Sequence, residues 1–273
     1  MNAETKPITW EAAVERLRRD PAQKALVDAC YYDDPLIEAA RRYHASNEWV
    51  AISALIGKPH SGARALELGA GRGIASYALA KDGWMVTAVE PDSSDIVGAG
   101  AIRAVAREAN LTIGVETRWG EQLPFPDRSF DLVFVRAVLH HARDLPAFCR
   151  EAARVLKPDG RFLAVREHVI TRDEDLVAFQ NAHPLHRFYG GENAFRLDQY
   201  MGAIKNAGLE LEQVLSPFAS DINLSPQSRR VLLSNQPGWW RALPNSIGLW
   251  LLTRAGVRSN APGRLYSFMA RKR

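Results

Sequence analysis

The stretch LELGAGRGIAS, residues 66–76, constrains the fold most, because three glycines follow an apolar run at alternate positions. An apolar run, a glycine-rich turn and a helix-forming segment in this order are typical of a strand that leads into a helix. Gly69, Gly71 and Gly73 allow a tight turn and let a ligand touch the backbone. The sequence therefore predicts a strand–turn–helix unit that binds a ligand, with a glycine-rich turn without a ligand as the alternative.

The spacing of the glycines argues against one common ligand of such turns. Nicotinamide dinucleotides require G-x-G-x-x-G/A, in which the last small residue lets the helix pack on the strand. Here Ile74 takes that place and is too bulky. Glu67, at the end of the predicted strand, suits the ammonium of a methionine-like group better than a pyrophosphate. Glu90 ends the next apolar run and can accept hydrogen bonds from two ribose hydroxyls, although a solvated acid is the alternative.

Strand-like and helical segments alternate along the rest of the chain. Residues 10–57 have helical spacing, and helices are expected at about 73–82 and 94–109. This alternation predicts an α/β fold, with a parallel sheet covered by helices on both faces. We expect a helical N-terminal extension over residues 1–60, which could act as a lid, and a ligand-binding domain over residues 61–273. Tyr43 and Trp49 are the expected lid contacts, with core packing as the alternative for Trp49.

Composition matches an ordinary globular protein. Hydrophobic residues make up 47% and charged residues 24% of the 273 residues. No apolar run reaches the roughly 20 residues that span a bilayer, and the N-terminus lacks the apolar segment of a secretory signal. Cys30 and Cys149 are far apart in the sequence, so we predict free thiols and no metal site. A cytoplasmic protein is expected.

Charge is unevenly distributed. After Asp221 the chain carries nine Lys and Arg residues and no Asp or Glu, so this end should attract anions. Residues 225–263 combine Trp239, Trp240 and Trp250 with several arginines. This composition suits peripheral contact with an anionic membrane, or an apolar and negatively charged substrate. A packed helical cap and an oligomer interface are the alternatives.

Four segments together resemble a known family. ALELGAGRG, AVEPD, GEQLPFPDRSFDLVFVRAVLHH and EAARVLKPDGRFLAV resemble successive motifs of the class I S-adenosylmethionine-dependent methyltransferases, in the small-molecule branch that includes the quinone-precursor C-methyltransferases. The resemblance covers about residues 62–168. It implies a Rossmann-like, seven-stranded sheet with an antiparallel last strand. LELEQVLSPF and GRLYSFMARKR fit the final two strands, with residues 225–263 as a helical insert before the last one.

The resemblance also implies a set of residues that bind S-adenosylmethionine and its product S-adenosylhomocysteine. Trp119 stands where the family often has an acidic residue for the adenine amino group, and its indole would either stack on the adenine or pack under its loop. Glu121 matches a family position and has loop structure as its alternative role. The predicted cofactor residues are Glu67, Gly69, Ala70, Gly71, Gly73, Glu90, Pro91, Trp119, Gly120, Glu121 and Arg136.

Methyl transfer from a sulfonium requires mainly that the acceptor be held in line with the methyl group. A general base is needed only when the acceptor must lose a proton. The candidates at strand ends are His168, His140 and Glu167, and histidine is the better base because its ordinary pKa lies near neutrality. His141 is a candidate for binding the acceptor. A paired histidine at this place also serves as structure in the family.

Acceptor recognition is expected in residues 181–200, which are rich in polar side chains; a solvated loop is the alternative. The candidates are His183, His186, Arg187, Tyr189 and Asn193. Nucleic acid is an improbable partner, because the Asn- or Asp-Pro-Pro-aromatic motif of base-methylating relatives is replaced by VRAVLHH. We therefore expect a methyltransferase that acts on a small-molecule, sugar-linked or lipid acceptor, with an anionic acceptor as one option. The alternative is a non-catalytic S-adenosylmethionine-binding sensor or partner protein.

Overall fold

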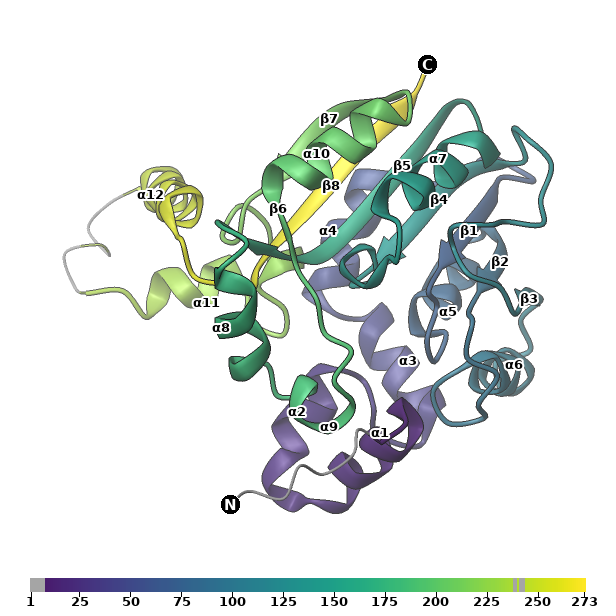
Figure 1. Cartoon of the computed structure of the whole chain (residues 1–273), viewed down its shortest axis with the longest axis horizontal. Helices are drawn as coiled ribbons and strands as arrows, with labels where there is room; N and C mark the ends of the chain where they lie inside the picture. Colours follow the sequence, from purple (N-terminus) through teal and green to yellow (C-terminus); the bar gives the residue numbers. More distant parts are fainter. Residues whose placement is uncertain (1–7, 238–239, 241–243) are drawn as a thin grey trace.

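The central sheet of the computed structural model has the predicted architecture (Figure 1). The structure describes residues 8–237, 240 and 244–273, without the side chain of Arg187. The strands are β1 (Arg64–Leu68), β2 (Met85–Val89), β3 (Ile113–Glu116), β4 (Phe130–Arg136), β5 (Leu156–Ile170), β6 (Phe195–Arg196), β7 (Leu209–Leu215) and β8 (Arg264–Lys272). Their order is β3-β2-β1-β4-β5-β8-β7. Strand β8 runs antiparallel to both neighbours, as predicted. The two-residue strand β6, which the sequence did not predict, pairs with β5 outside this order.

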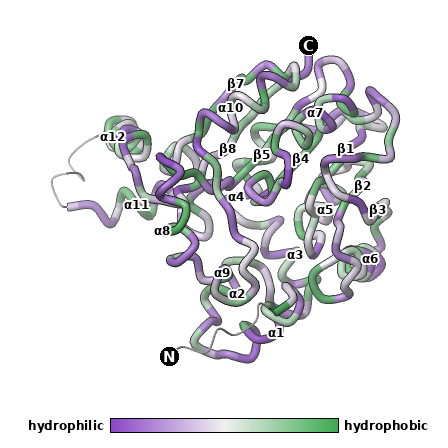
Figure 2. Tube along the Cα trace, in the orientation of Figure 1, coloured by the Kyte–Doolittle hydropathy of each residue, from purple (hydrophilic) through white to green (hydrophobic). Residues whose placement is uncertain are grey.

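Helices cover both faces of the sheet. They are α3 (Leu36–His44), α4 (Asn47–Ile56), α5 (Ile74–Lys81), α6 (Ala99–Glu108), α7 (Leu145–Val155) and α10 (Leu197–Asn206). Successive residues of a strand point to opposite faces. Val133 and Val135 of β4 therefore pack with α7 and α10, whereas Leu132 and Phe134 pack with α3, α4 and α5. Hydrophobic and hydrophilic stretches alternate along the chain for the same reason (Figure 2).

One helix begins later than predicted. The helix expected at 94–109 begins at Ala99. Asp92 and Ser94 form a turn instead: the Asp92 carboxylate accepts the Ser94 amide at 2.8 Å, and the Ser94 hydroxyl accepts the amides of Ile96 and Val97 at 2.9 and 3.3 Å. Such side-chain bonds to the backbone compete with a helix. They extend the loop after β2.

The first helices divide into two groups (Figure 1). Helices α3 and α4 belong to the sheet core, where Tyr43 and Trp49 are buried against each other with ring centroids 5.6 Å apart. The expectation that these two residues act as lid contacts is therefore wrong. Helices α1 (Trp10–Arg19) and α2 (Lys24–Ala29), joined by η1 (Pro21–Gln23), pack instead on α9 (His186–Tyr189) through a small cluster of Leu17, Val27 and Leu185.

The remaining elements are η2 (Leu139–His141), α8 (Asp175–Ala182), η3 (Asp221–Asn223), α11 (Arg229–Ser234) and α12 (Asn245–Arg258). Helices α11 and α12 extend from the sheet on the side away from β3 (Figure 1). Within the described part of the chain, no helix combines the length and apolar character needed to cross a membrane.

Candidate active site

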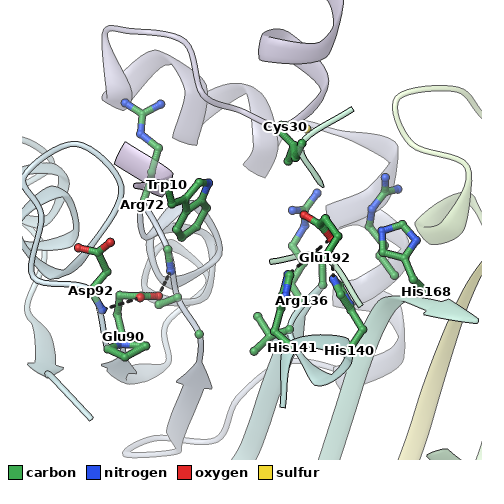
Figure 3. A pocket seen from close by; sticks show the side chains of 18 of the residues that line it. Trp10, Cys30, Arg72, Glu90, Asp92, Arg136, His140, His141, His168 and Glu192 are labelled. Carbon is green, nitrogen blue, oxygen red and sulfur yellow. Dashed lines mark hydrogen bonds and ion pairs between the residues drawn. The ribbon is translucent and has the colours of Figure 1, made fainter. Parts of the chain in front are cut away.

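A cavity of about 650 Å³ lies at the carboxyl ends of β1, β2, β4 and β5, where open parallel sheets bind their ligands. One half is bordered by the glycine-rich turn and the end of β2. The other half is bordered by η2, the end of β5 and the segment 183–192, with α1 and α2 across the opening. Figure 3 shows the two halves, with Glu90 and Asp92 in one and His140, His168 and Glu192 in the other.

The glycine-rich turn has the conformation that its sequence predicts. Gly69 and Gly73 have φ values of 67° and 78°, in the left-handed region that favours glycine. A Cβ at Gly69 would lie 2.5 Å from both Cγ atoms of Val138, and one at Gly73 would lie 3.2 Å from Ile102. Gly69, Ala70 and Gly71 line the cavity, whereas Gly73 packs against α6 and does not border it.

The two predicted carboxylates both border this half of the cavity. Glu90 accepts the amide of Gly71 at 2.7 Å with one oxygen and the amide of Asp92 at 3.0 Å with the other. Each carboxylate oxygen keeps a lone pair that a ribose hydroxyl can use. Glu67 is 3% exposed and accepts a hydrogen bond from the hydroxyl of Ser76. Burial raises the pKa of Glu67 to about 8 and that of Glu90 to about 7.

These features fit S-adenosylmethionine, the cofactor that the resemblance implies. A buried carboxylate is stabilised in its charged form by a nearby cation, so the ammonium of the methionine part would offset the burial of Glu67. The bare backbone of Gly69 and Gly71 leaves room beside it. Pro91 lines the same half next to Glu90.

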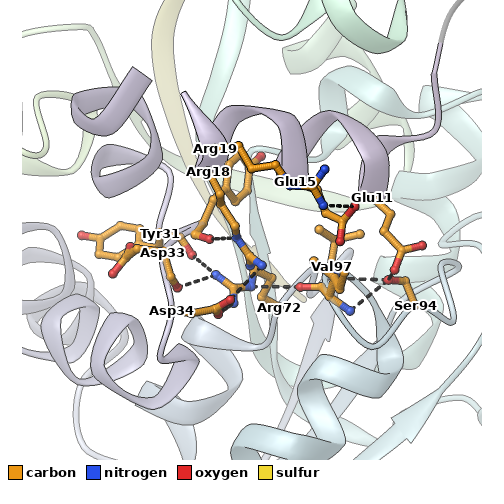
Figure 4. Close-up of polar contacts among 12 residues, drawn as sticks. Glu11, Glu15, Arg18, Arg19, Tyr31, Asp33, Asp34, Arg72, Ser94 and Val97 are labelled. Atoms are coloured by element: carbon orange, nitrogen blue, oxygen red, sulfur yellow. Dashed lines mark hydrogen bonds and ion pairs between the residues drawn. The ribbon is translucent and has the colours of Figure 1, made fainter. Parts of the chain in front are cut away.

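Arg72, between the glycines, connects the turn to the N-terminal segment (Figure 4). Its guanidinium donates to the carbonyl oxygens of Tyr31 and Asp33 at 2.8 Å each, and it pairs with the carboxylate of Asp34. A second connection joins the hydroxyl of Ser94 to Glu11 of α1 at 2.8 Å. The segment that closes the cavity is therefore bonded directly to the loops that would hold the cofactor.

The loop 118–121 forms the rim. Trp119 is 48% exposed, so it does not pack under its loop, and the guanidinium of Arg143 stacks 3.7 Å from its ring centroid. Glu121 accepts the amide of Arg143 at 2.9 Å, which is a loop-forming role. A Cβ at Gly120 would lie 2.3 Å from the ring of Phe148. All three predicted rim residues border the cavity.

Arg136 borders the cavity, but its charge is already paired. Its guanidinium donates to both carboxylate oxygens of the buried Glu48, at 2.6 and 3.0 Å. Arg166, which the sequence analysis did not single out, also lines the cavity and lies 3.8 Å from Glu48. It has a φ of 61° at a bulge in β5, and bulges often redirect side chains beside active sites. One buried carboxylate thus faces two guanidinium groups.

Glu167, predicted as a candidate base, does not border the cavity. Its fully buried carboxylate accepts the amides of Val138 and His140 at 3.1 Å each and lies 2.7 Å from Nδ1 of His140. Its burial raises its pKa to about 7. The carboxylate holds the turn after β4 and orients the His140 ring, so a direct catalytic role is wrong on geometric grounds.

His140 and His168 both border the cavity. Burial lowers the pKa of His168 to about 3, and it also places the pKa of His140 well below its ordinary value. The Nδ1 of His168 lies 2.8 Å from the carbonyl oxygen of Gly263. Both rings are therefore neutral near pH 7, and both are much weaker bases than a free imidazole.

The predicted acceptor residues are placed unequally. His141, His183 and Tyr189 line the cavity, whereas His186 and Asn193 do not, and the side chain of Arg187 lies outside the described residues. Tyr189 donates a hydrogen bond to Glu192. Sequence reasoning missed several lining residues, which are Trp10, Cys30, Tyr32, Arg166 and Glu192. None belongs to a local motif, because separate segments meet only in the fold.

Comparisons with known proteins concern the domain that carries this cavity. Residues 66–164 match a family of methyltransferase domains. The uncharacterised methyltransferase YcgJ of Bacillus subtilis is 36% identical over 118 residues, 43% of this chain and 46% of that protein. The 27-O-demethylrifamycin SV methyltransferase of Amycolatopsis mediterranei is 29% identical over 190 residues, 69% of this chain and 64% of that protein. The chain thus spans about half to two thirds of the length of these relatives.

A solved structure of geranyl diphosphate methyltransferase in complex with S-adenosylmethionine has the same fold, with a TM-score of 0.60 and 17% identity. The structural alignment covers 98% of this chain and 97% of that chain. The motifs, their order along the sheet and the family match agree with one another. Residues 66–164 therefore form a class I S-adenosylmethionine-dependent methyltransferase domain.

Proposed function

We propose that this chain transfers the methyl group of S-adenosylmethionine to a small molecule held in the histidine-lined half of the cavity. The observation that carries the proposal is that one cavity joins the two halves. Glu67 and Glu90 border one of them, and His168 and Glu192 border the other. A cofactor and an acceptor bound there would meet inside a space that α1 and α2 shield from water.

The cofactor supplies an already activated methyl group, so the protein contributes chiefly position and water exclusion. The neutral rings of His140 and His168 bind the acceptor in this proposal and do not remove its proton, because burial makes them weak bases. Glu167 acts indirectly, because its carboxylate orients the ring of His140.

The histidine-lined half, bordered by His140, His168 and Glu192, is called the acceptor half below, and the half bordered by Glu67 and Glu90 is called the cofactor half. The lining of the acceptor half favours a molecule with a large apolar part. Its apolar side chains include Leu26, Ala29, Val138, Leu185 and Leu265. Relatives in sequence include proteins named sterol 24-C-methyltransferase and ubiquinone biosynthesis O-methyltransferase, and these names support a lipid acceptor. The guanidinium groups of Arg136 and Arg166 add positive charge to the same wall.

Helix α12 supports the proposed membrane contact of residues 225–263. Ile247, Trp250 and Val257 are exposed and follow one another at helical spacing, with the guanidinium of Arg254 5.0 Å from the Trp250 ring centroid. A basic, apolar helix face of this kind suits an anionic membrane surface. A cytoplasmic protein that binds the membrane peripherally is part of this proposal.

The test is transfer of a labelled methyl group from S-adenosylmethionine into a cell extract that is then split into organic and aqueous phases. We expect label in the organic phase, and we expect Glu90→Ala to abolish it. Label in the aqueous phase would assign a soluble acceptor instead. Cofactor binding without transfer into any extract would favour the alternative of a non-catalytic sensor.

A further inference from the structure

The acceptor half of the cavity contains an unusual group of metal-ligand side chains. His140 follows β4, His168 lies in β5 and Glu192 follows α9, yet their ligand atoms all lie within 4.8 Å of one another. All three border the cavity (Figure 3). His140 and Glu192 are buried, at 2% and 4% exposure. Three separate segments therefore bring two imidazoles and a carboxylate to one point.

The two imidazoles are oriented as metal ligands usually are. The carbonyl oxygen of Gly263, which can only accept, lies 2.8 Å from Nδ1 of His168, so that nitrogen carries the hydrogen. Glu167, which already accepts two backbone amides, lies 2.7 Å from Nδ1 of His140. Each ring thus keeps its lone pair on Nε2. A histidine held through its other nitrogen by a carboxylate or carbonyl is the common second layer of a metal site.

The distances around Glu192 leave room for an ion. Its Oε2 atom lies 3.7 Å from Nε2 of His140 and 3.8 Å from Nε2 of His141, and its Oε1 atom lies 3.7 Å from Nδ1 of His183. These separations are too long for hydrogen bonds. Ligand atoms of a tetrahedral zinc ion are roughly 3.3–3.5 Å apart, which follows from bonds of about 2.0–2.2 Å. Small side-chain movements would close the gap.

A buried carboxylate also requires compensation. Among the described side chains, the groups within ion-pair distance of Glu192 are the imidazoles of His140, His141 and His183, and the Tyr189 hydroxyl donates a hydrogen bond to its Oε1 atom. The Nδ1 atom of His183 is buried without a hydrogen-bond partner. One hydroxyl donor and rings beyond hydrogen-bond distance compensate a buried carboxylate only in part, and a divalent cation would compensate it well.

We propose that His140, His168 and Glu192 bind a divalent transition-metal ion of the zinc class. Two imidazoles and one carboxylate suit zinc, cobalt or iron(II), whereas magnesium and calcium prefer oxygen ligands alone. Three protein ligands leave a position open toward the cavity. If the proposed transferase function holds, an oxygen or nitrogen of the acceptor would take this position, so His140 and His168 would hold the acceptor through the ion. The ion would lower the pKa of that acceptor group, and water could then take its proton without a strong general base.

The experiment titrates cobalt(II) chloride into the untagged, metal-depleted full chain, without cofactor or acceptor. We expect one equivalent to bind, with visible absorption typical of a nitrogen-containing site, and zinc to displace it. Magnesium chloride should not compete. Glu192→Gln and His168→Ala should each weaken cobalt binding at least thirtyfold. The control His60→Ala removes an exposed imidazole far from the cavity and should leave binding unchanged.

No saturable cobalt binding, or equal binding in Glu192→Gln, His168→Ala and His60→Ala, would overturn the proposal. Should the variants fail to fold, X-ray absorption of the cobalt-loaded wild-type chain decides, because a coordination shell without two imidazoles would also overturn it. S-adenosylhomocysteine binding, measured on the same samples, separates this result from the proposed function. If cobalt does not bind but cofactor binding and methyl transfer are intact, the metal site is rejected and the proposed methyltransferase function stands.

Discussion

The two halves of the cavity are built in different ways. The half that fits the cofactor comes from short loops directly after β1 and β2, and its main contact joins Glu90 to Gly71 across 2.7 Å. The other half comes from α2, η2, β5 and the segment 183–192, which are far apart in the sequence. The first half can be recognised from local motifs, and the second depends on how distant segments pack.

The difference also concerns charge. In the cofactor half, Glu67 and Glu90 are buried carboxylates with raised pKa values and no cationic side chain paired with them among the described residues. In the acceptor half, Glu48 is neutralised by Arg136 and Arg166. The first half therefore awaits a positively charged ligand group, whereas in the second half the Glu48 carboxylate already has cationic partners.

The largest effect is expected from Gly69→Ala. The added Cβ would lie 2.5 Å from Val138, so the turn must shift away from the cavity. We expect S-adenosylhomocysteine affinity, measured by calorimetry, to fall about a hundredfold, or about 2.7 kcal/mol. The matched control is Gly62→Ala, because Gly62 has a φ of 78° with nothing within 4 Å of its added Cβ. Equal affinities in the two variants would show that the turn does not hold the cofactor.

Glu67→Gln should stabilise the ligand-free protein in a pH-dependent way. The folded-state pKa of about 8 exceeds the ordinary value of 4.5, so raising the pH between these values ionises the unfolded state first and destabilises the fold. The glutamine removes this cost. We expect nearly equal unfolding free energies near pH 4 and a variant more stable by about 2 kcal/mol near pH 6, with a larger difference at higher pH, measured by urea denaturation.

A difference between wild type and Glu67→Gln that does not change with pH would contradict the buried, uncompensated carboxylate. Saturating S-adenosylmethionine serves as the internal control. With S-adenosylmethionine bound, the wild-type protein should have the larger unfolding free energy of the two, because only the carboxylate forms an ion pair with the ammonium of the cofactor.

Trp10→Ala tests whether the N-terminal helix covers the cofactor half. The Trp10 ring lines the cavity, and a Cβ added at Gly71 would lie 3.8 Å from it. We expect S-adenosylhomocysteine to dissociate about tenfold faster in stopped-flow measurements, equivalent to about 1.4 kcal/mol. Trp84→Ala, which removes a ring away from this cavity, should leave the rate unchanged. An unchanged rate in Trp10→Ala would mean that α1 closes only the acceptor half.

The smallest effect is expected from the segment 225–263. This segment contacts the acceptor half through the carbonyl oxygen of Gly263, which lies 2.8 Å from Nδ1 of His168. Trp250 is 56% exposed on α12. We expect Trp250→Ser to reduce binding to phosphatidylglycerol vesicles about threefold, in a co-sedimentation assay. Val50→Ser, which removes an exposed apolar side chain from α4, is the control. Failure of the wild-type chain to bind such vesicles would leave α12 without a membrane role.

Sequence reasoning succeeded where neighbouring residues decide the outcome. The conformation of Gly69, the end of β1 at Leu68 and the position of Glu90 all follow from short segments, in which apolar alternation and glycine determine the backbone. It failed for Glu167. Adjacent residues on a strand face opposite ways, and the bulge in β5 redirects Arg166 to the cavity while Glu167 turns toward the amides of η2.

By itself, the sequence determined the parallel part of the sheet and the loops that would hold S-adenosylmethionine, because these depend on local spacing and on the order of the strands. The antiparallel last strand was implied by the family resemblance. Only the tertiary structure decided which side chains face the acceptor. Arg166 and Glu192 have no shared motif, and they border the same cavity as His168 because helices and strands far apart in the chain pack around it. Burial then decides the chemistry, since it lowers the pKa values of His140 and His168 and makes both rings weaker bases than a free imidazole.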